Sequence, residues 1–304
     1  MVQATPNRTR TPVATTVHET HRLVRAQQQA GKHVGLVPTM GALHAGHLSL
    51  VQRSLNECDY TVVSIFVNPK QFSPTEDFTQ YPRNLEADLA QLSALGVPLV
   101  FAPEPGEMYP PGFGTSIDVS GLTDLWEGAL RPGHFRGVAT VVMKLFQIAP
   151  ADRAYFGRKD YQQALAVRRM AADLNLPIEI VVCPTIRDAD GLALSSRNVY
   201  LTPDQRKHAL ALPRSLRLAR EMFDAGERDA VKIRDFLRRS ITAAAGVQLD
   251  YATIADPETF AELSHIKNSA VALVAARVGK TRLIDNELLG FSEADLNRTN
   301  AKAH

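Results

Sequence analysis

The chain has 304 residues, enough for one large domain or two modest ones. Hydrophobic residues make up 45% and charged residues 22%, a balance typical of folded, water-soluble proteins that argues against disordered and fibrous classes. Lys and Arg outnumber Asp and Glu by only 34 to 32, so neither a nucleic-acid nor a membrane surface is indicated.

Residues 1–18 contain no acidic residue, and we expect them to form a ragged polar leader. Strand–helix alternation follows, and it predicts an α/β fold with a Rossmann-like parallel sheet. Because such sheets bind ligands at the carboxyl ends of their strands, the segment after the first strand is a candidate site. The expected strands are 33–40, 60–67, 97–103 and 178–185, and the expected helices are 46–58 and 84–96.

After about residue 188 the pattern changes to Ala- and Arg-rich helices, expected over 210–223 and 230–245, followed by a few strands. This pattern predicts a smaller α+β C-terminal domain over 188–290, after a Rossmann-like, ligand-binding domain over 1–187. The polar, turn-rich segment 188–198 is the expected hinge, and 291–304 are expected to form a flexible tail. The two cysteines, Cys58 and Cys183, have no spacing suited to a disulfide or metal site, so both are expected to be buried hydrophobes.

The segment GALHAGHLSLV (41–51) predicts an anion site at the start of a helix. Gly41 and Gly46 allow the backbone to approach a ligand, and a helix N-terminus presents unpaired N–H groups and a positive dipole. If the helix begins near Ala45, His44 and His47 lie on one side of its first turn and can donate to phosphate oxygens. Capping or core histidines are the alternative.

The segment is neither a Walker A loop nor a dinucleotide fingerprint. It resembles the His-x-Gly-His signature of the nucleotidyl-transferring superfamily that includes class I aminoacyl-tRNA synthetases, and LALSSRN (192–198) resembles that superfamily's later phosphate-binding loop. With FVNPKQF (66–72), RPGHFRGVATVV (131–142) and FGRKDYQQ (156–163), the set resembles pantothenate synthetase (pantoate–β-alanine ligase), in the same order.

The resemblance implies ligation of pantoate and β-alanine to pantothenate with ATP as a substrate, through a pantoyl adenylate, with release of AMP and pyrophosphate. Such chemistry requires orientation and charge neutralisation rather than a protein nucleophile. It also implies His47 as the candidate acid, His44 as its phosphate-binding companion, and Lys159 as a point charge for the phosphates, while Gln71 and Gln163 hold pantoate. The implied ATP-binding residues are Met40, Gly41, His44, His47, Gly157, Lys159, Asp160, Ile186, Leu194, Ser195, Ser196 and Arg197.

Asp88 matches a family acid near the metal and nucleotide, and an exposed helix acid is the alternative interpretation. Mg2+ is expected because it bridges and neutralises phosphates. His134 and Arg136 are candidates for orienting these elements, and a helix beginning at Lys159 would place Gln163 on the same face.

Two positions depart from the family pattern. Leu194 stands where the family usually has Met, a mild change in volume, and Arg158 stands where it usually has an acidic or amide residue. We expect Arg158 to be peripheral and to add a screened attraction for ATP. Two alternatives stay open: a nucleotidyltransferase of the same superfamily, such as one acting on phosphopantetheine, and a non-catalytic nucleotide-binding protein.

We expect a cytoplasmic enzyme, because no segment reaches the roughly 18 apolar residues that a membrane span requires. The expected partners are the small molecules pantoate, β-alanine and ATP, with no nucleic acid and no membrane. The family resemblance implies a homodimer.

Overall fold

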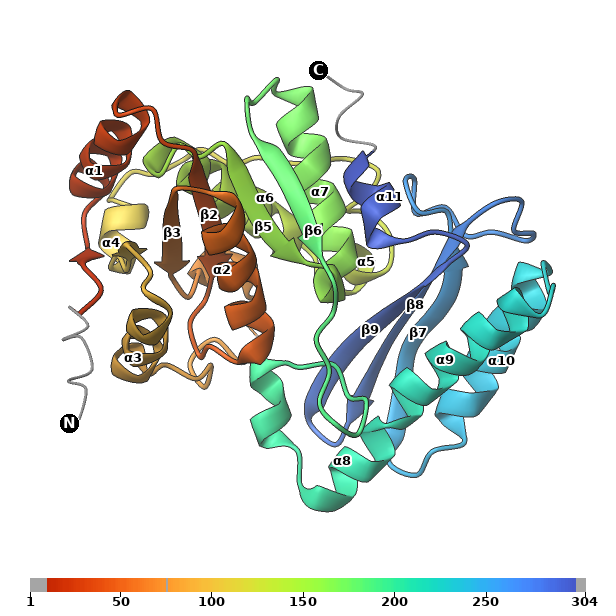
Figure 1. The fold of residues 1–304 in the computed structure, drawn as a ribbon. Coiled ribbons are helices and arrows are strands. Elements are labelled where there is room, and N and C mark those ends of the chain that lie inside the picture. Colours follow the sequence, from red (N-terminus) through yellow and green to blue (C-terminus); the bar gives the residue numbers. More distant parts are fainter. Residues whose placement is uncertain (1–9, 75, 299–304) are drawn as a thin grey trace, which may run out of the picture. The chain divides into compact units, whose positions relative to one another are not determined.

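The computed structural model describes residues 10–74 and 76–298 (Figure 1). The chain divides into two compact units, each of which is built from more than one stretch of sequence. The first unit contains the chain up to residue 118 with 131–156 and 170–181, and the second contains 119–130, 157–169 and the chain from 182 onward. The boundary expected at residue 187 lies near the last change of unit, but 119–130 and 157–169 join the second unit earlier along the chain.

The first unit is built around a six-stranded sheet with the order β1-β4-β3-β2-β5-β6. The β1–β4, β4–β3, β3–β2 and β2–β5 pairs are parallel, which confirms the Rossmann-like prediction. Central strands β2 and β3 are buried along almost their whole length, as expected of a sheet covered on both faces. The strands are β1 Val13–Ala14, β2 Val34–Thr39, β3 Tyr60–Ile65, β4 Leu99–Phe101, β5 Arg153–Gly157 and β6 Glu179–Cys183.

Helices cover this sheet, with α1 packed on α6 and β2, and α2 packed on β2 and β3. The strand order reverses between β2 and β5, and open α/β sheets bind ligands at the carboxyl ends of strands at such a point. Both strands are followed directly along the chain by segments with predicted ATP-binding residues. The helices are α1 Val17–Gln29, α2 Ala45–Glu57, α3 Leu85–Leu95, α4 Pro105–Met108 and α6 His134–Ile148, with a 3-10 turn η1 at Pro69–Gln71.

The second unit contains an antiparallel sheet of β7 Val247–Ala255, β8 Ala270–Val278 and β9 Thr281–Leu289. Amphipathic helices α9 Ala211–Asp224 and α10 Ala230–Thr242 pack on each other and on this sheet, and their apolar faces form its core. The smaller α+β domain is thereby confirmed. Its other elements are α5 Glu127–Leu130, η2 Arg158–Asp160, the start of α7 Tyr161–Asp173, η3 Ser196–Tyr200, α8 Pro203–Ala209 and α11 Glu293–Arg298.

Three expectations about the chain ends and the cysteines can be compared with the described residues. Part of the expected leader, 10–18, contains β1 and the start of α1, while 1–9 lie outside the described residues. Part of the expected tail is helical, because it contains α11 Glu293–Arg298. The Asn297 side chain of this helix bonds both backbone groups of Val182. Residues 299–304 lie outside the described residues. Cys183 is buried as expected, but Cys58 is half-buried, with Sγ 3.3 Å from the Tyr155 hydroxyl.

Candidate active site

The two histidines sit at the N-terminus of α2, as the sequence predicts. His44 is the N-cap residue, and its Nδ1 accepts a hydrogen bond from the Gly46 N–H at 3.1 Å. His47 reaches back with Nδ1 to the His44 N–H at 3.4 Å, and the two ring centroids lie 4.0 Å apart. Because each Nδ1 accepts, each neutral ring carries its proton on Nε2. The rings therefore cap the helix through Nδ1, and in the neutral form each ring has its N–H donor on Nε2.

The loop between β2 and α2 has a backbone shape that needs support. Gly41 and Ala42 have φ values of 77° and 49°, in the left-handed region that disfavours side chains. The support is Asp88 on α3, whose two carboxylate oxygens accept from Ala42 N–H at 2.9 Å and Leu43 N–H at 2.8 Å. A Cβ atom on Gly41 would lie 2.9 Å from Asp88 Oδ2, so this position also requires glycine for space.

Asp88 is only 2% exposed, so the alternative of an exposed helix acid is wrong. Burial raises the pKa of its carboxyl group above the ordinary value, although the two backbone N–H groups oppose this shift. A buried carboxylate that already accepts two N–H groups is poorly placed to bind a hydrated cation. Among the described residues, no group of three or more His, Cys, Asp or Glu side chains has a metal-binding arrangement.

Gln71, the first predicted pantoate residue, is buried and fixed by two neighbours. Its Nε2 lies 3.1 Å from the Met40 sulfur, and its Oε1 accepts from Asn68 Nδ2 at 3.1 Å. The structure therefore brings together two of the predicted residues, Met40 and Gln71. Asn68 is itself buried and also bonds Gly137 O and the Tyr109 hydroxyl. It was not predicted as a site residue, although Asn before Pro is a signal for a turn.

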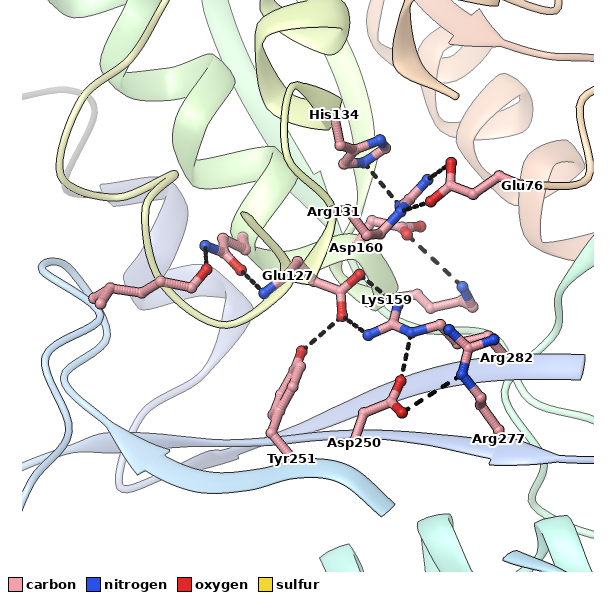
Figure 2. Close-up of polar contacts among 12 residues, drawn as sticks. Glu76, Glu127, Arg131, His134, Lys159, Asp160, Asp250, Tyr251, Arg277 and Arg282 are labelled. Atoms are coloured by element: carbon pink, nitrogen blue, oxygen red, sulfur yellow. Dashed lines mark hydrogen bonds and ion pairs between the residues drawn. The ribbon is translucent and has the colours of Figure 1, made fainter. Parts of the chain in front are cut away.

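A chain of three polar side chains, Glu76, Arg131 and His134, fixes the backbone at Gln71. His134 Nδ1 lies 2.9 Å from Gln71 O, and its Nε2 lies 3.0 Å from Arg131 Nη1. Arg131 in turn binds both carboxylate oxygens of Glu76 at 2.6 and 3.0 Å, as Figure 2 shows. This arrangement fits the His134 tautomer with its proton on Nδ1. Arg136, the other candidate for an orienting role, makes an exposed ion pair with Asp118.

In the second unit, the predicted Lys159 segment forms the turn η2 directly after Gly157. Helix α7 begins at Tyr161 and not at Lys159, because the 3-10 turn comes first. Lys159 Nζ lies 3.8 Å from the Asp160 carboxylate (Figure 2), a loose pair that leaves the Lys159 side chain one-fifth exposed. Gln163, the second predicted pantoate residue, is half-buried in the first turn of α7. The turn therefore holds a cation that is partly exposed to solvent.

The expected hinge is a tight hairpin within the second unit. Ile186 O accepts from Leu194 N–H at 3.0 Å, and Asp188 N–H donates to Leu192 O at 2.9 Å. The hairpin leads into Ser195, whose Oγ caps η3 by accepting from Arg197 N–H at 3.3 Å. The predicted residues Ile186, Leu194, Ser195, Ser196 and Arg197 are thereby gathered at one end of one hairpin.

Arg158 is buried, at 8% exposed, so the expectation of a peripheral, solvent-screened side chain is wrong. It is one of three arginines, with Arg187 and Arg220, whose charges act on Glu287 of β9. Burial raises the pKa of Glu287 above its ordinary value, and these three cations oppose the shift. Arg158, which departs from the family pattern, therefore lies near the carboxylate of Glu287.

Within the second unit, buried polar groups bind the segment 119–130 to the rest of that unit. Glu127 accepts two hydrogen bonds from Arg282, both at 2.7 Å, and one from the Tyr251 hydroxyl at 3.0 Å (Figure 2). Gln162, next to the predicted Gln163, donates to Leu122 O at 2.6 Å and Leu125 O at 2.9 Å. Bidentate pairs such as Arg282–Glu127 fix orientation as well as distance.

Comparison with known proteins identifies the family. The family model of pantoate-beta-alanine ligase matches residues 12–288. This chain belongs to the pantoate–β-alanine ligase family.

Curated relatives named pantothenate synthetase agree with this assignment. The protein of Roseiflexus sp. (strain RS-1) is 56% identical over 277 residues, covering 91% of this chain and 99% of that protein. The protein of Moorella thermoacetica is 53% identical over 278 residues, covering 91% and 98%.

Solved structures of the family show the same fold. Pantothenate synthetase from Thermus thermophilus matches with a TM-score of 0.87 at 49% identity, covering 91% of this chain and 98% of that chain. The ligase from Francisella tularensis, complexed with β,γ-ATP and β-alanine, matches with a TM-score of 0.75 at 34% identity, covering 93% and 99%. The predictions of an enzyme, a ligase that uses ATP, and the joining of pantoate to β-alanine are confirmed.

Proposed function

We propose that this ligase works in two steps and that the predicted residues carry out both. A pantoate carboxylate oxygen attacks the α-phosphorus of ATP, the bond from that phosphorus to the bridging oxygen breaks, and pyrophosphate leaves. The neutral β-alanine amine then attacks the acyl carbon, the bond to AMP breaks and the nitrogen loses a proton, so that pantothenate, AMP and one proton result. Neither step needs a protein nucleophile, so orientation and charge neutralisation carry the catalysis.

The observation that carries this proposal is the pair of imidazoles at the N-terminus of α2. Both rings accept through Nδ1, so in the neutral form each has its N–H donor on Nε2, and both rings lie beside a helix N-terminus that favours anions. We assign to His47 the predicted role of acid, as an Nε2–H hydrogen-bond donor to the leaving pyrophosphate without full proton transfer, and to His44 the role of its phosphate-binding companion. Lys159 adds a cation, Ser195 and Ser196 add hydroxyl groups and Arg197 adds a guanidinium group, while Leu194 belongs to the same segment. The rest of the proposed ATP site is Met40, Gly41, Gly157, Asp160 and Ile186.

Gln71 and Gln163 are the proposed pantoate residues. An amide donates to a carboxylate and accepts from a hydroxyl, which suits a hydroxy acid. Gln71 is the better supported of the two, because Asn68 and the Glu76–Arg131–His134 chain fix both its side chain and its backbone.

Mg2+ is proposed to enter with ATP, held mainly by phosphate oxygens, as is usual for this ion. Its chemistry there is to neutralise phosphate charge. Direct coordination by Asp88 does not fit the structure, since that carboxylate is buried and already accepts two N–H groups. We therefore assign to Asp88 the shape of the Met40–His44 loop.

We further propose that the smaller domain closes over ATP, and that the enzyme is a cytoplasmic homodimer. A cytoplasmic site is supported by the need for ATP, and size-exclusion chromatography with light scattering tests the dimer. In the described part of the chain, no helix has the length and apolar character needed to cross a bilayer.

The test of the mechanism is isotope exchange between pyrophosphate and ATP, with pantoate and Mg2+ but no β-alanine. Exchange that depends on pantoate is expected, because the adenylate forms before the amine is needed. A requirement for β-alanine in this exchange would exclude the two-step mechanism. Retention of AMP on the product would support a nucleotidyltransferase. ATP binding without any pyrophosphate exchange would support a non-catalytic nucleotide-binding protein. Gln163→Ala should raise the KM for pantoate more than the KM for ATP.

A further inference from the structure

Strand β9 contacts the two 3-10 turns of the second unit that contain proposed ATP-binding residues, η2 and η3. Two neighbouring residues in the middle of the strand, Asp285 and Asn286, bond to these segments. Both are almost completely buried, at 4% and 1% exposed, although both are polar. Successive residues of a strand point to opposite faces, so two neighbours can reach two different loops.

Asn286 holds the Lys159 turn. Its Nδ2 donates to Arg158 O at 2.9 Å and to Lys159 O at 3.0 Å, so both amide hydrogens bind successive carbonyl groups of η2. The two acceptors fix the orientation of the amide, because a flipped group would turn its oxygen toward two carbonyl oxygens. Its Oδ1 is buried without a hydrogen-bond partner among the described residues. Such an acceptor is destabilising, which argues that this residue serves geometry more than stability.

Asp285 holds the hairpin that carries Ile186 and Leu194. Its two oxygens accept from Arg187 Nη1 at 2.7 Å and Nη2 at 2.9 Å, in the bidentate geometry that fixes orientation. Arg187 directly follows Ile186, and its Nη1 also donates to Gly191 O at 3.2 Å across the hairpin. Asp285 Oδ1 also accepts from the Asn286 N–H at 2.8 Å, so the two anchors are joined to each other.

We propose that Asp285 and Asn286 are positioning residues for adenylation, which set the Lys159 turn and the 186–197 hairpin at a fixed spacing so that both engage ATP together. Neither side chain needs to touch the nucleotide for this role. The inference rests on the proposed ATP site, because the two loops carry its second-unit residues. Its consequence is a coupling: loosening one loop at β9 loosens the other.

Three variants test this proposal: Asn286→Ala, Asp285→Asn, and Thr253→Val as the matched control. Thr253 is equally buried in the same sheet, on β7, and its Oγ1 donates to Glu262 at 2.8 Å, away from both loops. In pyrophosphate exchange, the two β9 variants should each lose about tenfold or more in kcat/KM for ATP, the scale expected from small misplacements. Thr253→Val should lower the melting temperature and leave these constants unchanged.

Hydrogen exchange read by mass spectrometry gives a second measurement that needs no activity. Asn286→Ala should raise deuterium uptake in both 157–163 and 186–197, and a non-hydrolysable ATP analogue should protect both segments less than in the wild type. Increased uptake confined to 157–163 would overturn the coupling. Kinetic constants unchanged from the wild type, with a loss of melting temperature like that of Thr253→Val, would reduce both residues to a structural role. A wild type without pantoate-dependent exchange would refute the proposed mechanism while the uptake data still decide the coupling.

Discussion

Asp88→Asn separates two roles for the same residue, loop support and metal binding. The asparagine has nearly the same shape, but one of its two groups becomes an NH2 donor. Because Asp88 accepts from the N–H groups of both Ala42 and Leu43, one of these two would then face a donor. The variant therefore keeps the packing of α3 and breaks the support of the Met40–His44 loop.

The magnitude follows from those contacts. A hydrogen bond to a charged acceptor contributes about 1.5–3 kcal/mol, and a donor left facing a donor adds a desolvation cost, so the loop loses about 3 kcal/mol of support. The left-handed conformation of Ala42 costs about 1–2 kcal/mol. The lost hydrogen-bond support is larger than the cost of the left-handed Ala42 conformation that it offset, so the loop should relax to another conformation. If all of it falls on adenylation, the rate drops by about 10²-fold.

The assay is pantoate-dependent pyrophosphate exchange at a series of Mg2+ concentrations. We expect the defect of Asp88→Asn to be the same at every Mg2+ concentration, with the melting temperature little changed. Burial raises the pKa of this carboxyl group, so a neutral side chain relieves a desolvation cost that offsets the lost bond. Glu86→Gln, an exposed acid two residues earlier on α3, should behave like the wild type. Recovery of Asp88→Asn at high Mg2+ would show a metal ligand and refute the loop argument.

Three further predictions concern the other polar groups. His44→Ala and His47→Ala should each lower the rate of adenylation by about 10²-fold. His44→Asn retains an N-cap acceptor, so compared with His44→Ala it should restore the melting temperature but not the activity. Burial alone would raise the pKa of Glu76, but the hydrogen bonds and charge of Arg131 outweigh it and lower the pKa. Its carboxylate therefore stabilises the fold at pH values above the ordinary Glu pKa of about 4.3. The difference in unfolding free energy between wild type and Glu76→Gln, measured by urea titration, should be present at pH 7 and close as the pH falls below about 4; a constant difference would contradict the Arg131 assignment. Arg158→Glu should lower the melting temperature at every salt concentration, because the side chain is buried. Adding Glu287→Arg should restore part of this loss. An effect limited to the KM for ATP, and dependent on salt, would instead indicate a peripheral side chain.

Much of the fold could be predicted because local patterns and packing agree. The helix expected at 46–58 is α2 at Ala45–Glu57, and the strand expected at 60–67 is β3 at Tyr60–Ile65. Helix α6 gave no clear signal, because its sequence HFRGVATVVMKLFQI is rich in β-branched residues and is buried on most sides. Strand β5 was missed because its five residues are too few to show a period.

In the candidate site, the predictable residues are those within the family-like segments, such as His44, Lys159 and Ser195. Among the residues that hold these segments, Asp88 and His134 were named as candidates from the sequence, whereas Asp285 and Asn286 were missed because their partners lie far away along the chain. Asn286 bonds a carbonyl 128 residues earlier, and Asp285 binds an arginine 98 residues earlier. A single sequence shows neither pairing, and a polar residue inside a strand pattern gives no indication of its partner. Arg158 was misplaced for the same reason, since the carboxylate near it lies on β9.

The supporting residues share a feature that explains why charge patterns do not reveal them. Asp88 binds backbone N–H groups of the loop before α2, His134 binds the backbone carbonyl of Gln71, and Asn286 binds the backbone carbonyls of η2. Backbone groups are the same at every position, so no particular residue type is required in the loop that is held. The side chain that supports the loop, in contrast, is strictly constrained in its hydrogen-bonding groups. Asp88 must supply two acceptors, and Asn286 must supply two donors. Substitutions that preserve charge or size but change the number of donors should therefore be more harmful at these buried positions than at the more exposed Lys159–Asp160 pair, where the ammonium group can adjust its position.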